Sequence, residues 1–247
     1  MERIKIEVEK INISVLKKSN LPLFYIHGSG CDSTLWIGQL EEIGGYAIDL
    51  PNHGDSDGAE IDSVEDYAKF VVQVVKKTSG KGIIAGHSLG GAIAQMIYLK
   101  HRDLVRALIL IGTGARLKVF PKILEELSKN TDEAVNFLLD LAFAKKELLK
   151  DFKKIFKDRV QILLRDLNIC NRFDIIEDFK VGKLRFEIPT LAIVGEKDLL
   201  TPVKYSRFFA EFGAEIEIID NSGHMVMLEN PKRVNEVIKR FLKKLNF

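Results

Sequence analysis

Cysteine is scarce in this chain of 247 residues, and neither sign of charge is in clear excess. The two cysteines, Cys31 and Cys170, lie far apart in unrelated contexts, so we expect free thiols and no metal or disulfide site. The 37 basic and 35 acidic residues leave a net charge of +2, which indicates neither a nucleic-acid nor a membrane-surface partner. No apolar run approaches the roughly 18 residues of a membrane span, and the opening MERIKIEVEK contains no signal-peptide run. We therefore expect a cytoplasmic protein without a membrane span.

Short apolar segments recur along the chain at the length of strands. Six of them are apolar almost throughout, which is typical of parallel strands covered on both faces: residues 21–27, 46–50, 82–87, 105–111, 189–195 and 214–220. Residues 3–8 and 11–16 alternate apolar and polar side chains instead, which predicts a two-stranded pair at the edge of a sheet. Helical patterns lie between several of these strands, as in right-handed βαβ crossovers. The chain is therefore predicted to be an α/β protein.

Several predicted helices begin at recognisable capping residues. Ser63 supplies a cap, and Thr201-Pro202 and Asn230-Pro231 each supply a cap followed by a first-turn proline. From about residue 115 to residue 185, however, only helical patterns appear, and this is far more than one crossover requires. We interpret residues 1–114 and 186–247 as the core of the fold and residues 115–185 as a helical cap inserted in it.

A serine lies where a strand pattern gives way to a helix pattern, in Gly86-His87-Ser88-Leu89-Gly90. A strand that turns sharply into a helix crowds its backbone, so it requires small neighbours such as Gly86 and Gly90. The turn exposes the serine oxygen and places the first helical N–H groups beside it, where they favour negative charge. This sequence pattern predicts a nucleophile elbow with Ser88 as the nucleophile.

A serine hydroxyl is a weak nucleophile, so Ser88 requires a base and an orienting acid. His224 follows the last predicted strand and Asp198 follows the strand before it, so both should reach the sheet edge where Ser88 lies. Glu196 is a weaker candidate for the acid. The remaining histidines fit the role less well: His27 and His53 in His-Gly turns, His87 with its side chain directed away from the nucleophile, and His101 at the end of a charged helix. The order Ser88, Asp198, His224 is the one stated for α/β-hydrolases.

The tetrahedral intermediate of such a reaction requires backbone N–H donors for its oxyanion. Leu89 supplies one as the residue after the nucleophile, and the loop after the third strand, His27-Gly28-Ser29-Gly30, should supply the second. Within that loop Ser29 is the first choice and Gly30 the next. We also expect Gly28 and Gly30 to let the backbone approach the substrate. Trp36, the only tryptophan, is expected to pack beside this loop or to contact the substrate.

The chain resembles the α/β-hydrolase superfamily over nearly its whole length, and most of all its small esterases, lipases and C–C-bond hydrolases. The matching segments are HGSG (27–30), DLPNHGDS (49–56), GHSLGG (86–91), GEKDLLTP (195–202) and SGHMVMLENP (222–231). The resemblance implies a mostly parallel eight-stranded sheet with helices on both faces, a helical cap and no cofactor. The family's catalytic serine, acid and histidine correspond to Ser88, Asp198 and His224, and its oxyanion donors correspond to Ser29 and Leu89. Within DLPNHGDS, Asp49 and His53 are expected to organise a turn.

The leading hypothesis is a serine hydrolase that cleaves small-molecule carboxylic esters through an acyl-enzyme. Short to medium acyl chains are expected, with monoacylglycerols as one example. Four apolar side chains of the cap either form an acyl-binding lid or only pack the cap helices together: Phe137, Leu138, Leu141 and Phe143.

Three other functions are compatible with the same fold. A C–C-bond hydrolase or a thioesterase would use the same triad, and the former would need a basic side chain such as Arg116, Arg165 or Arg172 to receive a substrate carboxylate. A ligand-binding receptor with little turnover would leave Ser88 unreactive toward a fluorophosphonate probe. The intact triad favours an enzyme over a receptor.

Overall fold

An eight-stranded sheet forms the centre of the computed structural model, which describes residues 1–129 and 132–247. Its strands are β1 (Glu2–Val8), β2 (Ile11–Lys17), β3 (Leu23–Ile26), β4 (Tyr46–Ile48), β5 (Gly82–His87), β6 (Val105–Ile111), β7 (Thr190–Gly195) and β8 (Glu215–Ile219). They lie in the order β1-β2-β4-β3-β5-β6-β7-β8. The β1–β2 and β2–β4 pairs are antiparallel, and every pair from β4 to β8 is parallel. The predicted fold class is confirmed, with the alternating strands at one edge and several strands slightly shorter than predicted.

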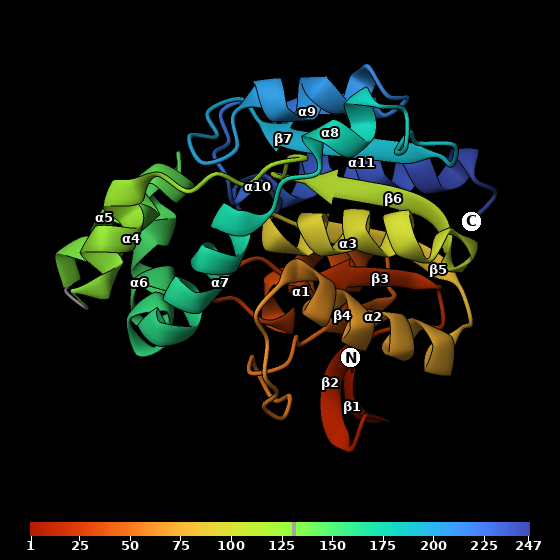
Figure 1. Cartoon of the computed structure of the whole chain (residues 1–247), viewed down its shortest axis with the longest axis horizontal. Helices are drawn as coiled ribbons and strands as arrows, with labels where there is room; N and C mark the ends of the chain where they lie inside the picture. The colour runs from red at the N-terminus through yellow and green to blue at the C-terminus, as the bar shows by residue number, and fades with distance from the viewer. Residues whose placement is uncertain (130–131) are drawn as a thin grey trace.

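Helices cover both faces of this sheet (Figure 1). α3 lies in front of β5 and β6 and packs on α2, whereas α11 passes behind β6 and packs with α1 and α10. α9 packs on β7 and β8. These elements and the short 3₁₀ helices are α1 (Ile37–Glu42), α2 (Val64–Thr78), α3 (Leu89–Lys100), α9 (Val203–Ala210), α10 (Val226–Glu229), α11 (Pro231–Lys244), η1 (Ser33–Trp36), η2 (Arg102–Leu104) and η3 (Lys146–Leu148).

Two of the three predicted helix caps are confirmed. The Ser63 hydroxyl accepts a hydrogen bond from a first-turn amide of α2 at 3.1 Å, and Asn230 caps α11 with Pro231 in the first turn. The expectation for Thr201-Pro202 is wrong, because Pro202 itself occupies the cap position of α9. The Thr201 hydroxyl makes other hydrogen bonds, to the predicted acid and base. A residue that looked like a helix cap therefore belongs to the candidate site.

The segment between β6 and β7 contains α4 (Pro121–Ser128), α5 (Asp132–Ala142), α6 (Leu149–Asp158), α7 (Val160–Arg172) and α8 (Ile176–Lys180). Figure 1 shows α4 to α7 grouped beyond the end of the sheet toward which the β6 arrow points. α8 departs from the predicted arrangement, because its Phe179 packs against Phe208, Phe209 and Phe212 of the α9 segment. This aromatic cluster attaches α8 to the core, although residues 115–185 were all expected in the cap.

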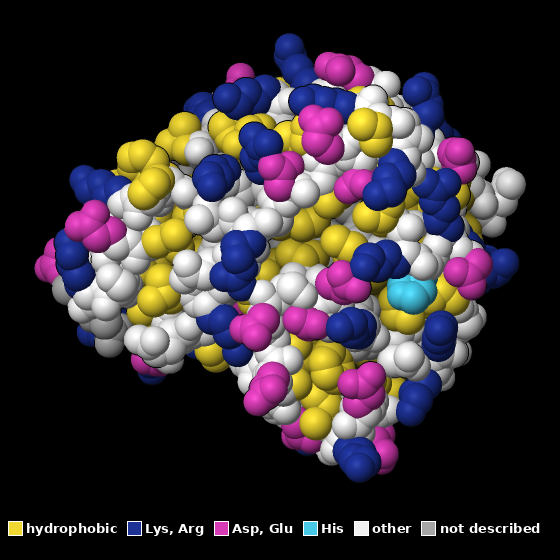
Figure 2. All heavy atoms as spheres, viewed as in Figure 1, with side chains coloured by type: hydrophobic (Ala, Val, Ile, Leu, Met, Phe, Trp, Pro, Cys, Tyr) yellow, Lys and Arg dark blue, Asp and Glu magenta, His cyan; other side chains and the backbone are white. Residues whose placement is uncertain are grey.

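Charged side chains of both signs are scattered over the face drawn in Figure 2. Among the described residues, no helix combines the length and the apolar character needed to cross a bilayer.

Candidate active site

Ser88 occupies the sharp turn between β5 and α3, with φ 52° and ψ −114°. An L-residue rarely adopts this conformation, and holding it costs on the order of 1–3 kcal/mol. The flanking glycines are required by close backbone contacts: a Cβ on Gly86 would lie 2.1 Å from the Gly90 carbonyl oxygen, and one on Gly90 would lie 2.2 Å from the Ile26 carbonyl oxygen. The strained turn leaves Ser88 partly exposed at the base of a cavity.

His224 and Asp198 form a buried hydrogen-bonded pair next to this turn. The His224 Nδ1 lies 2.9 Å from Asp198 Oδ2, and the two side chains are 6% and 0% exposed. The other carboxylate oxygen, Oδ1, accepts the backbone amides of Leu200 and Thr201 at 2.9 and 2.8 Å. The Thr201 hydroxyl lies 2.8 Å from Asp198 Oδ2 and 3.1 Å from His224 Nδ1. The acid is therefore held in one orientation by three donors besides the histidine.

A second buried carboxylate holds the loop that carries His224. Glu229 Oε1 accepts the Gly223 amide at 2.8 Å, and its Oε2 accepts the amides of Ala144 and Lys145 at 2.9 and 2.8 Å. The His224 amide also donates to the carbonyl oxygen of Ala142 at 2.8 Å. The histidine loop is thus tied to the chain that follows α5.

The sequence predicted that the His87 side chain is directed away from the nucleophile, but the structure places it in the site. Its ring lies 4.7 Å from the His224 ring, centroid to centroid, and lines the same cavity. Its Nε2 is 3.1 Å from the His224 carbonyl oxygen, so Nε2 carries the proton and donates. Burial, and secondarily the neighbouring His224, lowers the pKa of His87 well below its usual value, so the ring is neutral. No pattern in the sequence indicated this contact, because His224 lies 137 residues further along the chain.

The loop after β3 lies against Ser88, as expected for a source of oxyanion donors. Gly28 and Ser29 line the cavity, and a Cβ on Gly28 would lie 3.3 Å from Ser88 Cβ. Gly30 departs from its predicted role, because its amide donates to the Asp166 carboxylate at 3.0 Å. Leu89 begins α3, so its amide is at the positive end of that helix.

Trp36 also departs from a substrate-binding role. It is fully buried, and its ring packs against Tyr25 with centroids 5.2 Å apart. The structure therefore supports the packing role that was the other expectation for this residue.

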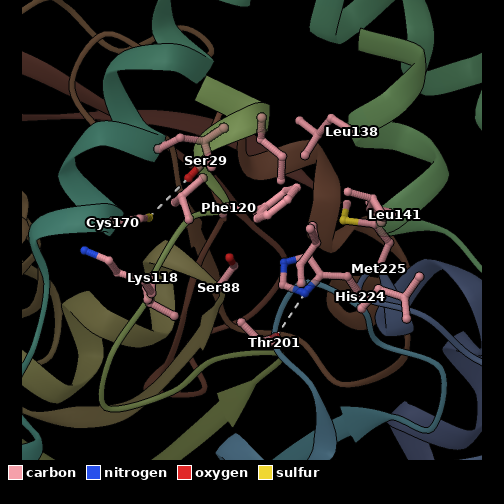
Figure 3. A pocket seen from close by; sticks show the side chains of 18 of the residues that line it. Ser29, Ser88, Lys118, Phe120, Leu138, Leu141, Cys170, Thr201, His224 and Met225 are labelled. Carbon is pink, nitrogen blue, oxygen red and sulfur yellow. Dashed lines mark hydrogen bonds between the residues drawn. The ribbon is translucent and has the colours of Figure 1, made fainter. Parts of the chain in front are cut away.

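The cavity above Ser88 encloses about 490 Å³ and is lined mostly by apolar side chains (Figure 3). Leu138 and Leu141 line it, whereas Phe143 packs on Phe152 with ring centroids 5.1 Å apart. Phe137 is only partly buried against the core. The predicted four-residue cluster is thus divided between the cavity wall and helix packing.

Both free cysteines line this cavity as well. Burial raises the pKa of Cys31 and of Cys170 to about 12, so both thiols are protonated near neutral pH. In the part of the chain that is described, His, Cys, Asp and Glu side chains form no group of three that could hold a metal ion.

The sequence model of the alpha/beta hydrolase family matches residues 23–237 of the chain. The chain belongs to this family. The structure of a thermophilic esterase superposes on this α/β-hydrolase with a TM-score of 0.96 at 50% sequence identity, covering 98% of each chain. A Mycoplasma pneumoniae protein named as a candidate esterase/lipase is 26% identical over 219 residues, which cover 80% of this chain and 78% of that protein. An Acinetobacter baylyi enzyme named (E)-2-((N-methylformamido)methylene)succinate hydrolase is 25% identical over 243 residues, which cover 90% of each protein.

The three arginines considered as carboxylate receptors of this α/β-hydrolase have partners elsewhere. Arg116 pairs with Asp174, Arg165 donates to the Tyr67 hydroxyl at 2.9 Å, and Arg172 donates to the Asp62 carbonyl oxygen. The cationic side chains that do line the cavity are Lys118 and Lys204. The sequence singled out neither lysine, since surface lysines on helices and loops carry no signal of their own.

Proposed function

We propose that this α/β-hydrolase cleaves carboxylic esters by nucleophilic catalysis, with Ser88 as nucleophile, His224 as base and Asp198 as the orienting acid. The observation that carries the proposal is the buried His224–Asp198 pair beside a strained serine at the base of one apolar cavity. The esterase at 50% identity over 98% of the chain supports the ester as substrate.

In this mechanism the His224–Asp198 contact fixes the tautomer of the imidazole. Nδ1–H donates to the Asp198 carboxylate, so Nε2 carries the lone pair and takes the Ser88 proton during attack on the ester carbonyl. The imidazolium that forms is stabilised by the buried carboxylate, and it then protonates the leaving alcohol. Water attacks the acyl-enzyme by the same route and releases the carboxylic acid.

The negative charge of each tetrahedral intermediate would be held by the backbone amides of Ser29 and Leu89. The Leu89 amide is at the N-terminus of α3, where the helix dipole favours an anion. Each donor of such a pair contributes roughly 3 kcal/mol to transition-state stabilisation.

Esters with short to medium acyl chains are the proposed substrates because of the volume and lining of the cavity. A volume of about 490 Å³ lies within the range of roughly 300–1,000 Å³ that holds small organic ligands. Leu138 and Leu141 supply apolar contacts for the acyl chain. Rates on p-nitrophenyl esters from acetate to palmitate test this part of the proposal, and a preference for the longest chains would contradict it.

C–C-bond cleavage is the alternative reaction. It was expected to use a basic side chain such as Arg116, Arg165 or Arg172 to receive a substrate carboxylate, and all three are engaged with other groups. This role would therefore fall to Lys118 or Lys204, which line the cavity. Thioesters would meet the same triad as oxygen esters, so parallel assays on acyl thioesters separate these two substrate classes.

Replacement of the nucleophile tests the reaction itself. The Ser88→Ala enzyme should lose hydrolysis of p-nitrophenyl butyrate and labelling by a fluorophosphonate while keeping the wild-type thermal unfolding midpoint. Ser79→Ala, an exposed serine at the end of α2, is the matched control and should retain both activities. Near-native turnover by Ser88→Ala would overturn the assignment.

A further inference from the structure

A buried carboxylate outside the proposed triad connects α7 to the loop after β3. Asp166 of α7 is fully buried, and its Oδ2 accepts the Gly30 amide at 3.0 Å and lies 2.8 Å from His53 Nε2. Its Oδ1 accepts the Tyr67 hydroxyl at 2.7 Å. Arg165, also on α7, lies 3.5 Å from Oδ1 and is partly exposed. The proposed triad mechanism assigns no role to this group.

The His53 ring lies between two hydrogen-bond partners. Its Nδ1 lies 2.9 Å from the Pro51 carbonyl oxygen, and its Nε2 lies 2.8 Å from the Asp166 carboxylate. Burial by itself would raise the pKa of Asp166, but the hydrogen bond and charge of His53 and the bonds from Gly30 and Tyr67 lower it below its usual value. A buried carboxylate with this many donors is held in one position.

The same face of α7 contacts two consecutive positions of the loop, Ser29 and Gly30. Leu163, Asp166 and Cys170 are spaced by three and four residues, so they project from one side of the helix. Cys170 Sγ lies 3.6 Å from the Ser29 hydroxyl, and Leu163 packs against Gly30, where a Cβ would lie 3.1 Å from its side chain. Gly30 has φ 68°, a conformation that a glycine adopts without strain. α7 therefore supports the loop through three side chains, and two of them, Leu163 and Cys170, also line the cavity.

We propose that Asp166 is a positioning residue that sets the oxyanion hole by holding the Gly30 amide. The inference rests on the proposed function, because it concerns the donor loop of that reaction. Asp166 fixes the peptide group between Ser29 and Gly30, while the Cys31 amide closes the turn by donating to the Gly28 carbonyl oxygen at 3.2 Å. With both ends held, the Ser29 amide keeps one direction, toward the substrate carbonyl oxygen that becomes the oxyanion. The helical insertion thus contributes to transition-state stabilisation as well as to the cavity wall.

The Asp166→Asn enzyme tests this role with almost no change of shape. An amide NH₂ at the Oδ2 position meets the Gly30 and His53 donors, and at the Oδ1 position it meets the Tyr67 hydroxyl, whose oxygen already accepts from Arg165. Either way the neutral asparagine holds the Gly30 amide less firmly than the carboxylate does. The loop is then displaced or loosened, and a misplacement of about 1 Å costs up to about 100-fold in rate. We expect kcat on p-nitrophenyl butyrate to fall by about tenfold to 100-fold with KM nearly unchanged.

A pair of inhibitors separates positioning from general damage. A trifluoromethyl ketone adds to Ser88 and forms an oxyanion, whereas the matching methyl ketone binds mainly as a ground-state ligand. Asp166→Asn should weaken the first by the same factor as kcat and leave the second unchanged. Binding of the trifluoromethyl ketone to wild type and its loss in Ser88→Ala report on the proposed function separately.

Two further variants complete the test. Arg172→Gln removes another contact between α7 and the core, remote from residues 28–31, and should leave kcat and the inhibitor ratio unchanged. Tyr67→Phe removes one donor to Asp166 but leaves the Gly30 bond, so it should reduce kcat in the same direction and to a smaller extent. This variant keeps the proposal testable if Asp166→Asn does not fold. Unchanged kcat and inhibitor ratio in the folded Asp166→Asn enzyme, or equal losses in Arg172→Gln, would overturn the proposal.

Discussion

Replacement of Asp198 by asparagine should reverse the tautomer of His224. The two backbone amides that donate to Oδ1, at 2.9 and 2.8 Å, require an acceptor, so they hold the asparagine oxygen in that position. The NH₂ group must then occupy the Oδ2 position, 2.9 Å from His224 Nδ1, where it donates. Nδ1 becomes the acceptor and the ring proton moves to Nε2. His224 can then no longer accept the proton of Ser88.

The expected decrease in kcat follows from this change of tautomer. In a serine protease the equivalent substitution lowers kcat about 10⁴-fold, which corresponds to about 5.5 kcal/mol of transition-state stabilisation. The cost to folding should be smaller. The Thr201 hydroxyl, 2.8 Å from Oδ2, can rotate to accept from the new amide, so only about 1–2 kcal/mol of stability should be lost.

The assay is kcat on p-nitrophenyl butyrate together with thermal unfolding. Glu196→Gln is the matched control, because Glu196 is the other acid near the end of β7 but is exposed and accepts the Asn221 amide at 3.1 Å. That variant should remain close to wild type. A folded Asp198→Asn enzyme with kcat within about tenfold of wild type, or a larger loss in Glu196→Gln, would refute the reasoning.

Three further predictions follow from the same geometry. Ser88→Gly should unfold at a higher temperature than Ser88→Ala, because glycine relieves about 1–3 kcal/mol of strain at φ 52°; equal midpoints would contradict this. Burial lowers the pKa of His27 from 6.5 to about 4, so the stability that its neutral ring contributes is present above pH 6.5 and is lost as the pH falls toward 4. This loss of unfolding free energy is on the order of 3 kcal/mol, is measured by urea titrations at several pH values, and should be smaller in His27→Gln. Leu138→Phe should narrow the cavity and shift the acyl optimum to shorter chains, whereas Phe137→Leu should not.

The residues of the proposed triad could be predicted from local sequence because each follows a recognisable strand. Ser88 lies between glycines at a strand-to-helix junction, and Asp198 and His224 follow β7 and β8. Parallel strands bring their carboxyl ends to one edge of the sheet, so order along the chain implied proximity in space. The structure places His224 Nδ1 2.9 Å from Asp198 Oδ2.

The supporting contacts could not be predicted in this way. Thr201 looked like a helix cap, and its hydrogen bond to His224 depends on how two loops after neighbouring strands meet. Asp166 gave no signal among the charged residues of a helical segment, and it lies 113 residues from His53 along the chain. The contact of His87 with His224 joins residues 137 positions apart, which the pattern of apolar and polar side chains does not encode.

Neighbouring residues along the chain thus identify the strained serine turn, because a strand, a tight turn and a helix each require particular residues in immediate succession. Packing between distant segments decides the other contacts: the Asp198 carboxylate held by Thr201, the loop after β3 held by α7, and the apolar cavity that both the core and the insertion line. The physical reason is that a buried polar group needs hydrogen-bond partners, and segments far apart along the chain can supply them once they pack together. The partners of Asp166 come from α2 and from the loops after β3 and β4, which meet only when the insertion packs against the core.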